Sequence, residues 1–162
     1  QHQTHLTPTL KKELDTMNEF TPVRNIEHSQ LVLNHGLWPN FKEADIYNVV
    51  FQKNDDAPNI GTPKDNIDIE ISFELHDLEQ PYIVVLKFDD CDSIIMGELD
   101  HKTALCDLTF TYKARGTDIE GDPLPRGIAV HFDEAFGKRL SFNCLKVQAL
   151  ERRLKYSNNK IH

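Results

Sequence analysis

Acidic side chains form the densest group of chemically capable residues in this sequence. Between residues 54 and 100 only Lys64 and Lys87 oppose the carboxylates of Asp55, Asp56, Asp65, Asp68, Glu70, Glu74, Asp77, Glu79, Asp89, Asp90, Asp92, Glu98 and Asp100. Carboxylates at this density could ligate a cation, work as acid–base pairs or attract a basic partner. Pairs of acids also arise by chance on an acidic surface, so the spacing of motifs has to decide between these chemistries.

Motif spacing assigns none of these groups to catalysis or to metal binding. Asn54-Asp55-Asp56 begins like a calcium loop, but the Gly and Glu that an EF-hand requires at its sixth and twelfth positions are missing. The eight histidines show no His-x-x-x-His spacing, and His76-Asp77 and Asp100-His101 are better explained as exposed turn residues than as ligands. The sequence contains no glycine-rich phosphate loop, Gly-x-Ser-x-Gly elbow or Rossmann fingerprint. We therefore expect no catalytic residue, no metal site and no cofactor.

The net charge of the chain is -8 at pH 7, and the imbalance is local. The acidic body argues against nucleic-acid binding, because phosphate contacts require Lys and Arg. It favours a basic partner through electrostatic steering, although solubility alone also explains an acidic surface. The C-terminal tail is basic instead, with Lys146, Arg152, Arg153, Lys155 and Lys160 against Glu151.

Cysteine usage and hydropathy indicate a cytoplasmic protein. Cys91, Cys106 and Cys144 are odd in number and form no Cys-x-x-Cys pair, which fits reduced thiols better than a disulfide framework. No stretch approaches the roughly 20 apolar residues that span a bilayer, and the N-terminus has no signal-peptide pattern. We therefore expect no membrane partner.

The clearest element is a strand over Asn66 to Leu75. Its apolar residues alternate with polar ones, and successive strand side chains point to opposite faces of a sheet. A helix would scatter the same residues around its circumference. The pattern predicts one dry face and one wet face that carries Asp68, Glu70 and Glu74, as in an antiparallel sheet.

The rest of the chain repeats this pattern in steps of hairpin length. Strand-like stretches cover 44–52, 82–88, 93–96, 104–113, 128–132 and 140–149, with a bulge or turn near Cys144 where the alternation shifts. Asp89-Asp90-Cys91-Asp92 predicts an acidic turn and Gly97 a bulge, while 53–65 and 114–127 read as loops. The prediction is a mainly β (α+β) domain, either an antiparallel β-sandwich or a barrel-like roll.

One or two short helices are expected before the strands. Thr9–Phe20 and Ser29–His35 fit short helices, the second with Ser29 as its N-cap and Gly36 at its left-handed end. Trp38 is expected to anchor the core. The predicted organisation is a helical extension packed on the sheet over 1–35, a β domain over 36–152 and a solvated basic tail over 153–162.

Three stretches resemble one protein family in their order and spacing. They are Gly36-Leu37-Trp38-Pro39-Asn40-Phe41-Lys42-Glu43-Ala44-Asp45-Ile46; Ile83-Val84-Val85-Leu86-Lys87-Phe88 with Asp107-Leu108-Thr109-Phe110; and Val130-His131-Phe132-Asp133-Glu134-Ala135-Phe136-Gly137 with Leu140-Ser141-Phe142-Asn143-Cys144. From about Gly36 to Arg152 the chain resembles immunity protein family 50 of bacterial polymorphic toxin systems. That family tends to read Phe-His-Asp-Ala-Glu after its Trp-Pro entry. Here the His is missing and the acids are exchanged, so a role tied to that His does not carry over.

The resemblance implies a small cytoplasmic protein, made beside a toxin, that binds and blocks this cognate toxin without catalysis or a cofactor. The family-motif positions are Trp38, Pro39, Phe41, Glu43, Asp45, Phe132, Gly137 and Phe142. The acidic composition favours a basic toxin, for instance a nuclease. The toxin-binding candidates are Asp55, Asp56, Asp68, Glu70, Glu74, Asp89, Asp90 and Asp92, each of which plain solvation also explains.

Two other functions fit the same pattern of strands. A β-barrel could hold a small ligand, or an enzyme site, in its mouth, and a pocket with converging polar groups would favour this function. A structural homo-oligomer could instead form through an exposed strand edge. A convex, pocketless acidic surface would favour the toxin binder over the barrel, and a single concentration-independent mass in solution would count against the oligomer.

Overall fold

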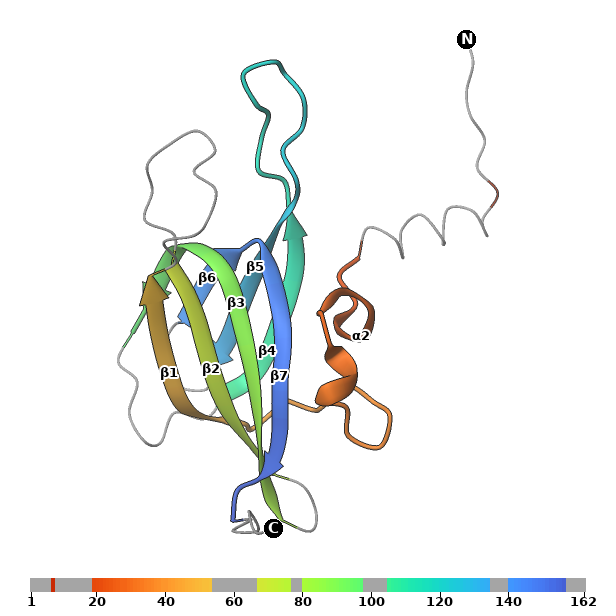
Figure 1. The fold of residues 1–162 in the computed structure, drawn as a ribbon, viewed down its shortest axis with the longest axis vertical. Helices are drawn as coiled ribbons and strands as arrows, with labels where there is room; N and C mark the ends of the chain where they lie inside the picture. The colour runs from red at the N-terminus through yellow and green to blue at the C-terminus, as the bar shows by residue number, and fades with distance from the viewer. Residues whose placement is uncertain are drawn as a thin grey trace.

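In the computed structural model the described residues are Thr7, 19–53, 67–76, 80–97, 105–134 and 140–156. They form the short helix α2 (Pro22–Asn25), the 3-10 helix η1 (Ser29–Leu31) and seven strands (Figure 1). The strands are β1 (Asp45–Lys53), β2 (Ile67–His76), β3 (Pro81–Met96), β4 (Leu105–Lys113), β5 (Gly127–Glu134), β6 (Leu140–Cys144) and β7 (Lys146–Leu154).

The strands form one antiparallel sheet. Its order is β1-β2-β3-β6-β5-β4, and β7 pairs with the first part of β3. This arrangement confirms the mainly β fold class. Within the described ranges the sheet is not closed into a barrel, and β1, β4 and β7 each pair with a single strand.

Strand β3 belongs to both halves of the sheet because it bends. Its residues 82–89 pair with β7, whereas Asp92, Ile95 and Met96 pair with β6. Asp90 and Ser93 have positive φ values of 54° and 52° at the bend. The sheet therefore folds over into two layers, with β1, β2 and β7 in front and β4, β5 and β6 behind in Figure 1.

The bend of β3 corrects two predictions and confirms a third. The acidic turn predicted at 89–92 is wrong, because this stretch remains strand and bulges turn its direction without ending it. The irregular position is not Gly97, since β3 ends at Met96. The predicted break near Cys144 is confirmed at Leu145, whose N–H donates to the carbonyl of Asp89 over 2.9 Å.

Aromatic rings fill the space between the two layers. Phe73 of β2 stacks on Phe132 of β5 with ring centroids 6.0 Å apart, and Phe88 of β3 meets Phe142 of β6 edge to face at 5.0 Å. The dry face predicted for β2 is confirmed by the buried side chains of Ile69, Ile71, Phe73 and Leu75. Among the described residues these rings fill the interior between the two layers of the open sheet.

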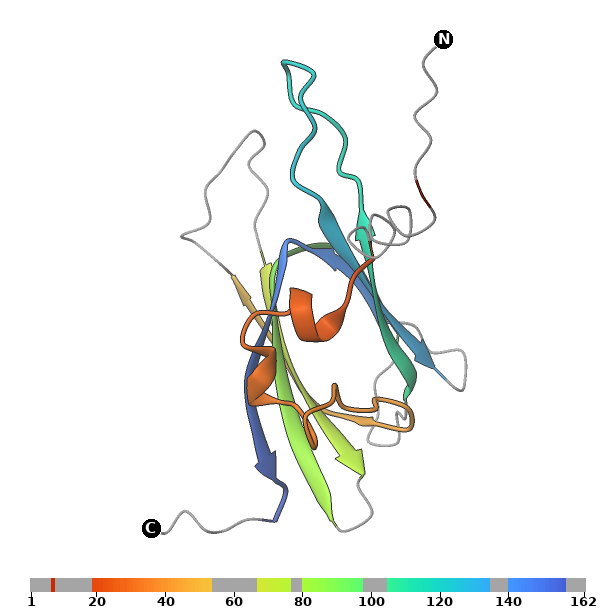
Figure 2. The ribbon, with the colours of Figure 1, turned by 90° about the vertical axis from the view of Figure 1, so that its right-hand side faces the viewer.

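Residues 19–44 cover the open side of the folded sheet, between β7 and β4 (Figure 2). On one side the N–H and the carbonyl of Glu27 bond to the backbone of β7 over 2.9 and 2.8 Å. On the other side Phe20 stacks on Phe110 of β4 at 5.1 Å. Ile26 and Val32 are buried between these two contacts. The segment is therefore part of the core and joins the two layers.

The helices expected in this N-terminal segment are shorter than predicted. Most of the helix expected at 9–20 lies outside the described residues. The helix expected at 29–35 is reduced to η1, where the Ser29 hydroxyl donates to the carbonyl of Val23 over 2.6 Å instead of capping. So short a helix has little stability of its own. Here the backbone pairing of Glu27 with β7 decides the path of the chain.

Gly36 closes a hairpin-like turn and not a helix. The backbones of Asn34 and Leu37 exchange two hydrogen bonds, of 2.8 and 3.0 Å. His35 and Gly36 between them have φ values of 52° and 79°, as a two-residue turn of this hand requires. The turn leads directly into Trp38, which packs against the core as expected.

Candidate functional site

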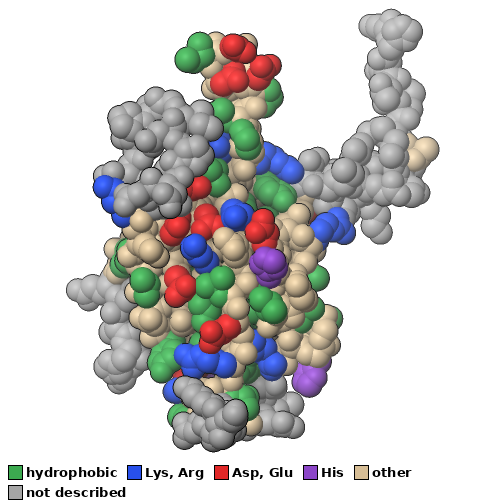
Figure 3. Space-filling view, in the orientation of Figure 1, with side chains coloured by type: hydrophobic (Ala, Val, Ile, Leu, Met, Phe, Trp, Pro, Cys, Tyr) green, Lys and Arg blue, Asp and Glu red, His purple; other side chains and the backbone are tan. Residues whose placement is uncertain are grey.

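The front face of the sheet carries the acids predicted on β2, but its charge is largely compensated. Figure 3 shows acidic and basic side chains interspersed over this face. Asp68 is only 7% exposed: one oxygen accepts the N–H of Asp90 over 3.0 Å and the other lies 3.8 Å from the Lys87 ammonium. The wet face predicted here is wrong for Asp68, because the bend of β3 covers it. Glu70, on the same face, is half-buried.

The carboxylate of Asp89 is also engaged in contacts within the protein. Its carboxylate accepts a hydrogen bond from Gln148 over 2.5 Å and lies 3.6 Å from the ammonium of Lys87 and 3.7 Å from that of Lys146. Asp89 is 8% exposed. Two neighbouring cations compensate its charge. Asp89, predicted as a toxin-binding residue, therefore links β3 to β7 and is not part of an exposed contact surface.

Glu74 forms an ion pair with Lys155, in the stretch predicted to be a solvated tail. This carboxylate raises the pKa of Lys155, and a hydrogen bond with Tyr156 adds to the effect. The Lys155 N–H also donates to the carbonyl of Pro81 over 3.2 Å. Strand β7 continues to Leu154, so the described part of the tail lies against the sheet.

Asp90 and Asp92 line a hollow of about 330 Å³ at the bend of β3. Its other walls include Lys113 at the end of β4 and Arg115 just beyond that strand. Burial raises the pKa of Asp90, Asp68 and Asp89 raise it further, and Lys146 and Arg115 oppose them. Acids on one wall and cations on the other leave this hollow without a field of one sign.

The loop predicted at 114–127 is confirmed over 114–126, but the prediction did not show its shape. This segment is a hairpin between β4 and β5 that rises beyond the ends of the other strands (Figure 1). Its tip consists of Asp118, Ile119, Glu120, Gly121 and Asp122, all exposed, and Ile119 is 104% exposed. Figure 3 shows the carboxylates gathered beside an apolar side chain at this tip.

Asp118 holds the tip in a fixed conformation. Its carboxylate accepts the N–H groups of Glu120 and Asp122, both over 2.9 Å, and its own N–H donates to the carbonyl of Asp122 over 2.8 Å. Gly121 supplies the positive φ of 86° that the turn requires. Aspartate commonly orders turns in this way. The sequence signal was therefore Asp-x-x-Gly in a polar loop, with one isolated isoleucine.

Cations gather at the base of the same hairpin. The guanidinium of Arg126 lies 4.0 Å from the ring centroid of Tyr112, and Arg115 donates to the carbonyl of Pro125 over 3.5 Å. Lys113 is exposed beside them. The hairpin is therefore acidic at its tip and basic at its root.

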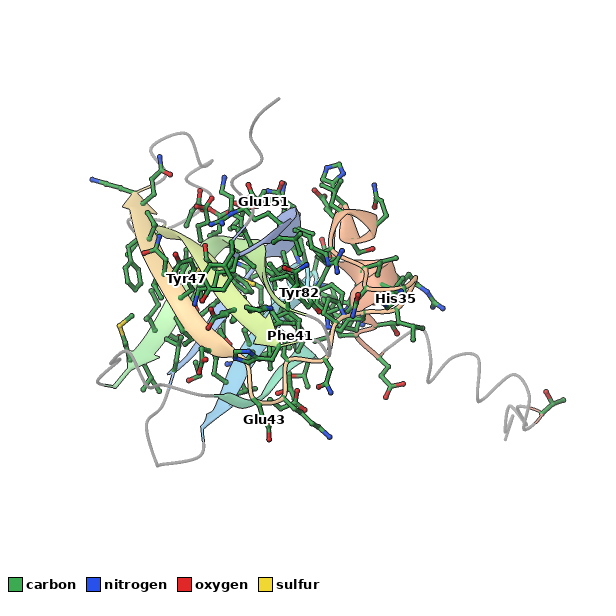
Figure 4. The ribbon with its side chains drawn as sticks, turned by 90° about the horizontal axis from the view of Figure 1, so that it is seen from below. His35, Phe41, Glu43, Tyr47, Tyr82 and Glu151 are labelled. Atoms are coloured by element: carbon green, nitrogen blue, oxygen red, sulfur yellow. The ribbon has the colours of Figure 1, made fainter. Side chains whose placement is uncertain are left out.

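The family-motif positions mostly shape the fold. The core contains Phe41, Phe132 and Phe142; Trp38 is half-buried against it, and Pro39 is buried. Glu43 is exposed, has a φ of 64° and points away from the sheet (Figure 4). Asp45 begins β1. Gly137, Asp55 and Asp56 lie outside the described residues.

Three potential metal ligands meet where β1 begins and β2 ends. His76 Nε2 lies 3.3 Å from Asp45 Oδ2, and Asp45 stands opposite Glu74 in the strand register. The ligand atoms of the three side chains all lie within 4.8 Å of one another. The sequence alone does not show this cluster, because Asp45 lies 31 residues before His76 and meets it only through the pairing of β1 with β2.

The described cysteine side chains are structural. Cys91 and Cys144 are buried free thiols, and burial raises the pKa of each. Cys91 donates to the carbonyl of Phe88 over 3.3 Å. A buried neutral thiol is a poor nucleophile and a poor metal ligand.

Comparison with known proteins finds no matching protein family, curated protein or solved structure. Among the described residues no helix has the length and hydrophobicity to span a membrane. The fold and site define an antiparallel β domain that projects a pre-ordered acidic hairpin.

Proposed function

We propose that this chain is a non-catalytic immunity protein that binds and neutralises a basic toxin domain through the tip of hairpin 114–126. The observation that carries the proposal is the fixed tip, in which three carboxylates surround the fully exposed Ile119. The geometry supports protein binding. The resemblance to immunity protein family 50 supports a cognate bacterial toxin as the particular partner.

The charges of the tip suit a basic partner. Asp118, Glu120 and Asp122 lie at the end of a projection, far from the cations that compensate Asp68 and Asp89. Exposed charges of one sign steer an oppositely charged protein and accelerate its association. A nuclease toxin, whose cleft attracts phosphate, is the class that best fits this charge.

Ile119 supplies the second part of a binding hot spot. An apolar side chain that enters a pocket of the partner, within a ring of polar contacts, carries most of the energy in many interfaces. The hydrogen bonds of Asp118 order the tip before binding, which reduces the entropy lost on association. The combination predicts that charge controls association and that Ile119 controls dissociation.

The test uses the immobilised chain and lysate of the source cells, at low and moderate salt. We expect capture of one basic protein whose toxic activity is lost on binding. The substitution Ile119→Ser should weaken this complex by about 30-fold or more, mainly through faster dissociation. The triple variant D118N/E120Q/D122N should slow association and flatten its salt dependence.

A matched variant separates the tip from net charge. The exposed residues Glu27, Glu43 and Glu151 lie on other segments, so E27Q/E43Q/E151Q changes the net charge equally and should bind like wild type. If both triple variants bind alike, the tip is not the contact surface. If no captured protein loses activity on binding, the immunity function itself is wrong.

A further inference from the structure

Two carboxylates face each other across the paired ends of β1 and β2. Asp45 and Glu74 are register partners. Side chains in such positions have Cβ atoms about 4.5–5.5 Å apart, and like charges there destabilise a sheet unless a cation lies between them. His76 and Lys155 are the groups beside this pair, His76 on Asp45 and Lys155 on Glu74.

The backbone places three good metal ligands on one face. Glu74 and His76 are two residues apart on β2 and so share a face, and the antiparallel register adds Asp45 from β1. Their ligand atoms lie within 4.8 Å of one another. Ligands at about 2.0–2.2 Å from one zinc ion are roughly 3–4 Å apart, so small rotamer changes would bring these three into one coordination sphere.

The surroundings are enclosed on one side and open on the other. The Glu74 side chain is 12% exposed, that of Asp45 33% and that of His76 53%. The inner carboxylate is thus desolvated and the outer side has room for water ligands. One imidazole with two carboxylates and water suits a divalent transition metal such as Zn²⁺.

We propose that Asp45, Glu74 and His76 form a surface site for a divalent transition-metal ion, which replaces the ammonium of Lys155 at Glu74. The metal and Lys155 compete for the same carboxylate, so occupancy of the site releases the lysine that follows β7. The site joins the first residue of β1 to the end of β2. It does not depend on the hairpin or on toxin binding.

Zinc titration of the full chain, after removal of bound metal with a chelator, tests this site by calorimetry. Other histidines can also bind zinc, so the informative quantity is the difference between variants. H76Q and D45N should each weaken one binding event by about tenfold or more. H131Q, which alters an exposed histidine on β5, should leave that event unchanged. The proposal is overturned if H76Q and H131Q titrate alike.

The substitution Lys155→Met tests the competition separately. Removal of the competing ammonium should tighten zinc binding several-fold, and equal or weaker binding by K155M contradicts the exchange. Imidazole resonances in NMR spectra report the location directly. On addition of zinc the signals of His76 should shift before those of His131, and the reverse order would place the metal elsewhere.

Discussion

The carboxylate of Asp68 on β2 accepts the backbone N–H of Asp90 on β3 over 3.0 Å, at the point where β3 bends between the two layers. A residue that alternation assigns to a solvated face therefore fixes the main irregularity of the fold. The ammonium of Lys87 lies between Asp68 and Asp89, 3.8 and 3.6 Å from their oxygens, and compensates both charges. The bend thus depends on buried polar contacts as well as on the apolar core.

Substitution of Asp68 by alanine should destabilise the fold by about 1–3 kcal/mol, because it leaves the N–H of Asp90 without its acceptor in a covered position. Urea unfolding measures this free energy. Glu70→Ala, on the same face but more exposed, is the matched control and should change stability by less than about 0.5 kcal/mol. Equal effects of the two variants would show that Asp68 does not hold the bend.

Asp90→Asn should stabilise the protein at neutral pH. Burial, Asp68 and Asp89 raise the pKa of Asp90, so the folded state binds this proton more tightly than the unfolded chain does. The corresponding stability is present below the ordinary pKa of 3.8 and is lost as the pH rises above it. Asparagine removes the repulsion and tolerates the φ of 54° at this position.

Because solvent screens this partly exposed carboxylate, the expected gain is only about 0.3 kcal/mol at pH 7, and it should shrink as the pH falls towards 3.8. Unfolding at several pH values gives the profile. The exposed neighbour Asp92 provides D92N as a control with little expected change. A D90N protein less stable than wild type at pH 7 would mean that the carboxylate makes a net favourable contact.

Phe20→Ala should cost about 3–5 kcal/mol, as expected for removal of a buried aromatic ring. Phe20 is 8% exposed and stacks on Phe110, while its segment bonds to β7 on the other side. Val23→Ala, at a side chain 45% exposed, should cost less than about 0.5 kcal/mol. Similar unfolding free energies for both variants would mean that residues 19–44 are not part of the core.

The thiols of Cys91 and Cys144 should resist modification in the native state. Burial raises the pKa of both, so at pH 8 they remain neutral and covered. In a C106S background, a thiol reagent should react with them only as fast as the protein unfolds, and rapidly in urea. Stability should also fall as the pH rises beyond the ordinary thiol pKa of 9.0, because only the unfolded chain ionises readily. Fast reaction of the native protein would contradict their burial.

The local alternation of apolar and polar residues predicted the positions of the strands well, but it predicted the exposure of the charged side chains poorly. The alternation of β2 identified its buried face, since neighbouring side chains of a strand always point to opposite sides. The same rule assigned Asp68 to solvent, because it takes no account of the neighbouring strands. The projection of the hairpin tip was not predicted either, because the sequence of a 14-residue loop (114–127) does not indicate how far the loop extends from the sheet.

The sequence by itself determined that the chain folds into antiparallel strands with a break near Cys144, because periodicity is a local property, and that its net charge is -8 at pH 7. Only the tertiary structure decided which acids remain uncompensated. Asp89 meets Gln148 at a separation of 59 residues, and Glu74 meets Lys155 across the sheet. Such pairs form only when the bend of β3 and the docking of β7 bring distant segments together. Within the described ranges, the tip of hairpin 114–126 is an acidic surface that projects beyond these contacts.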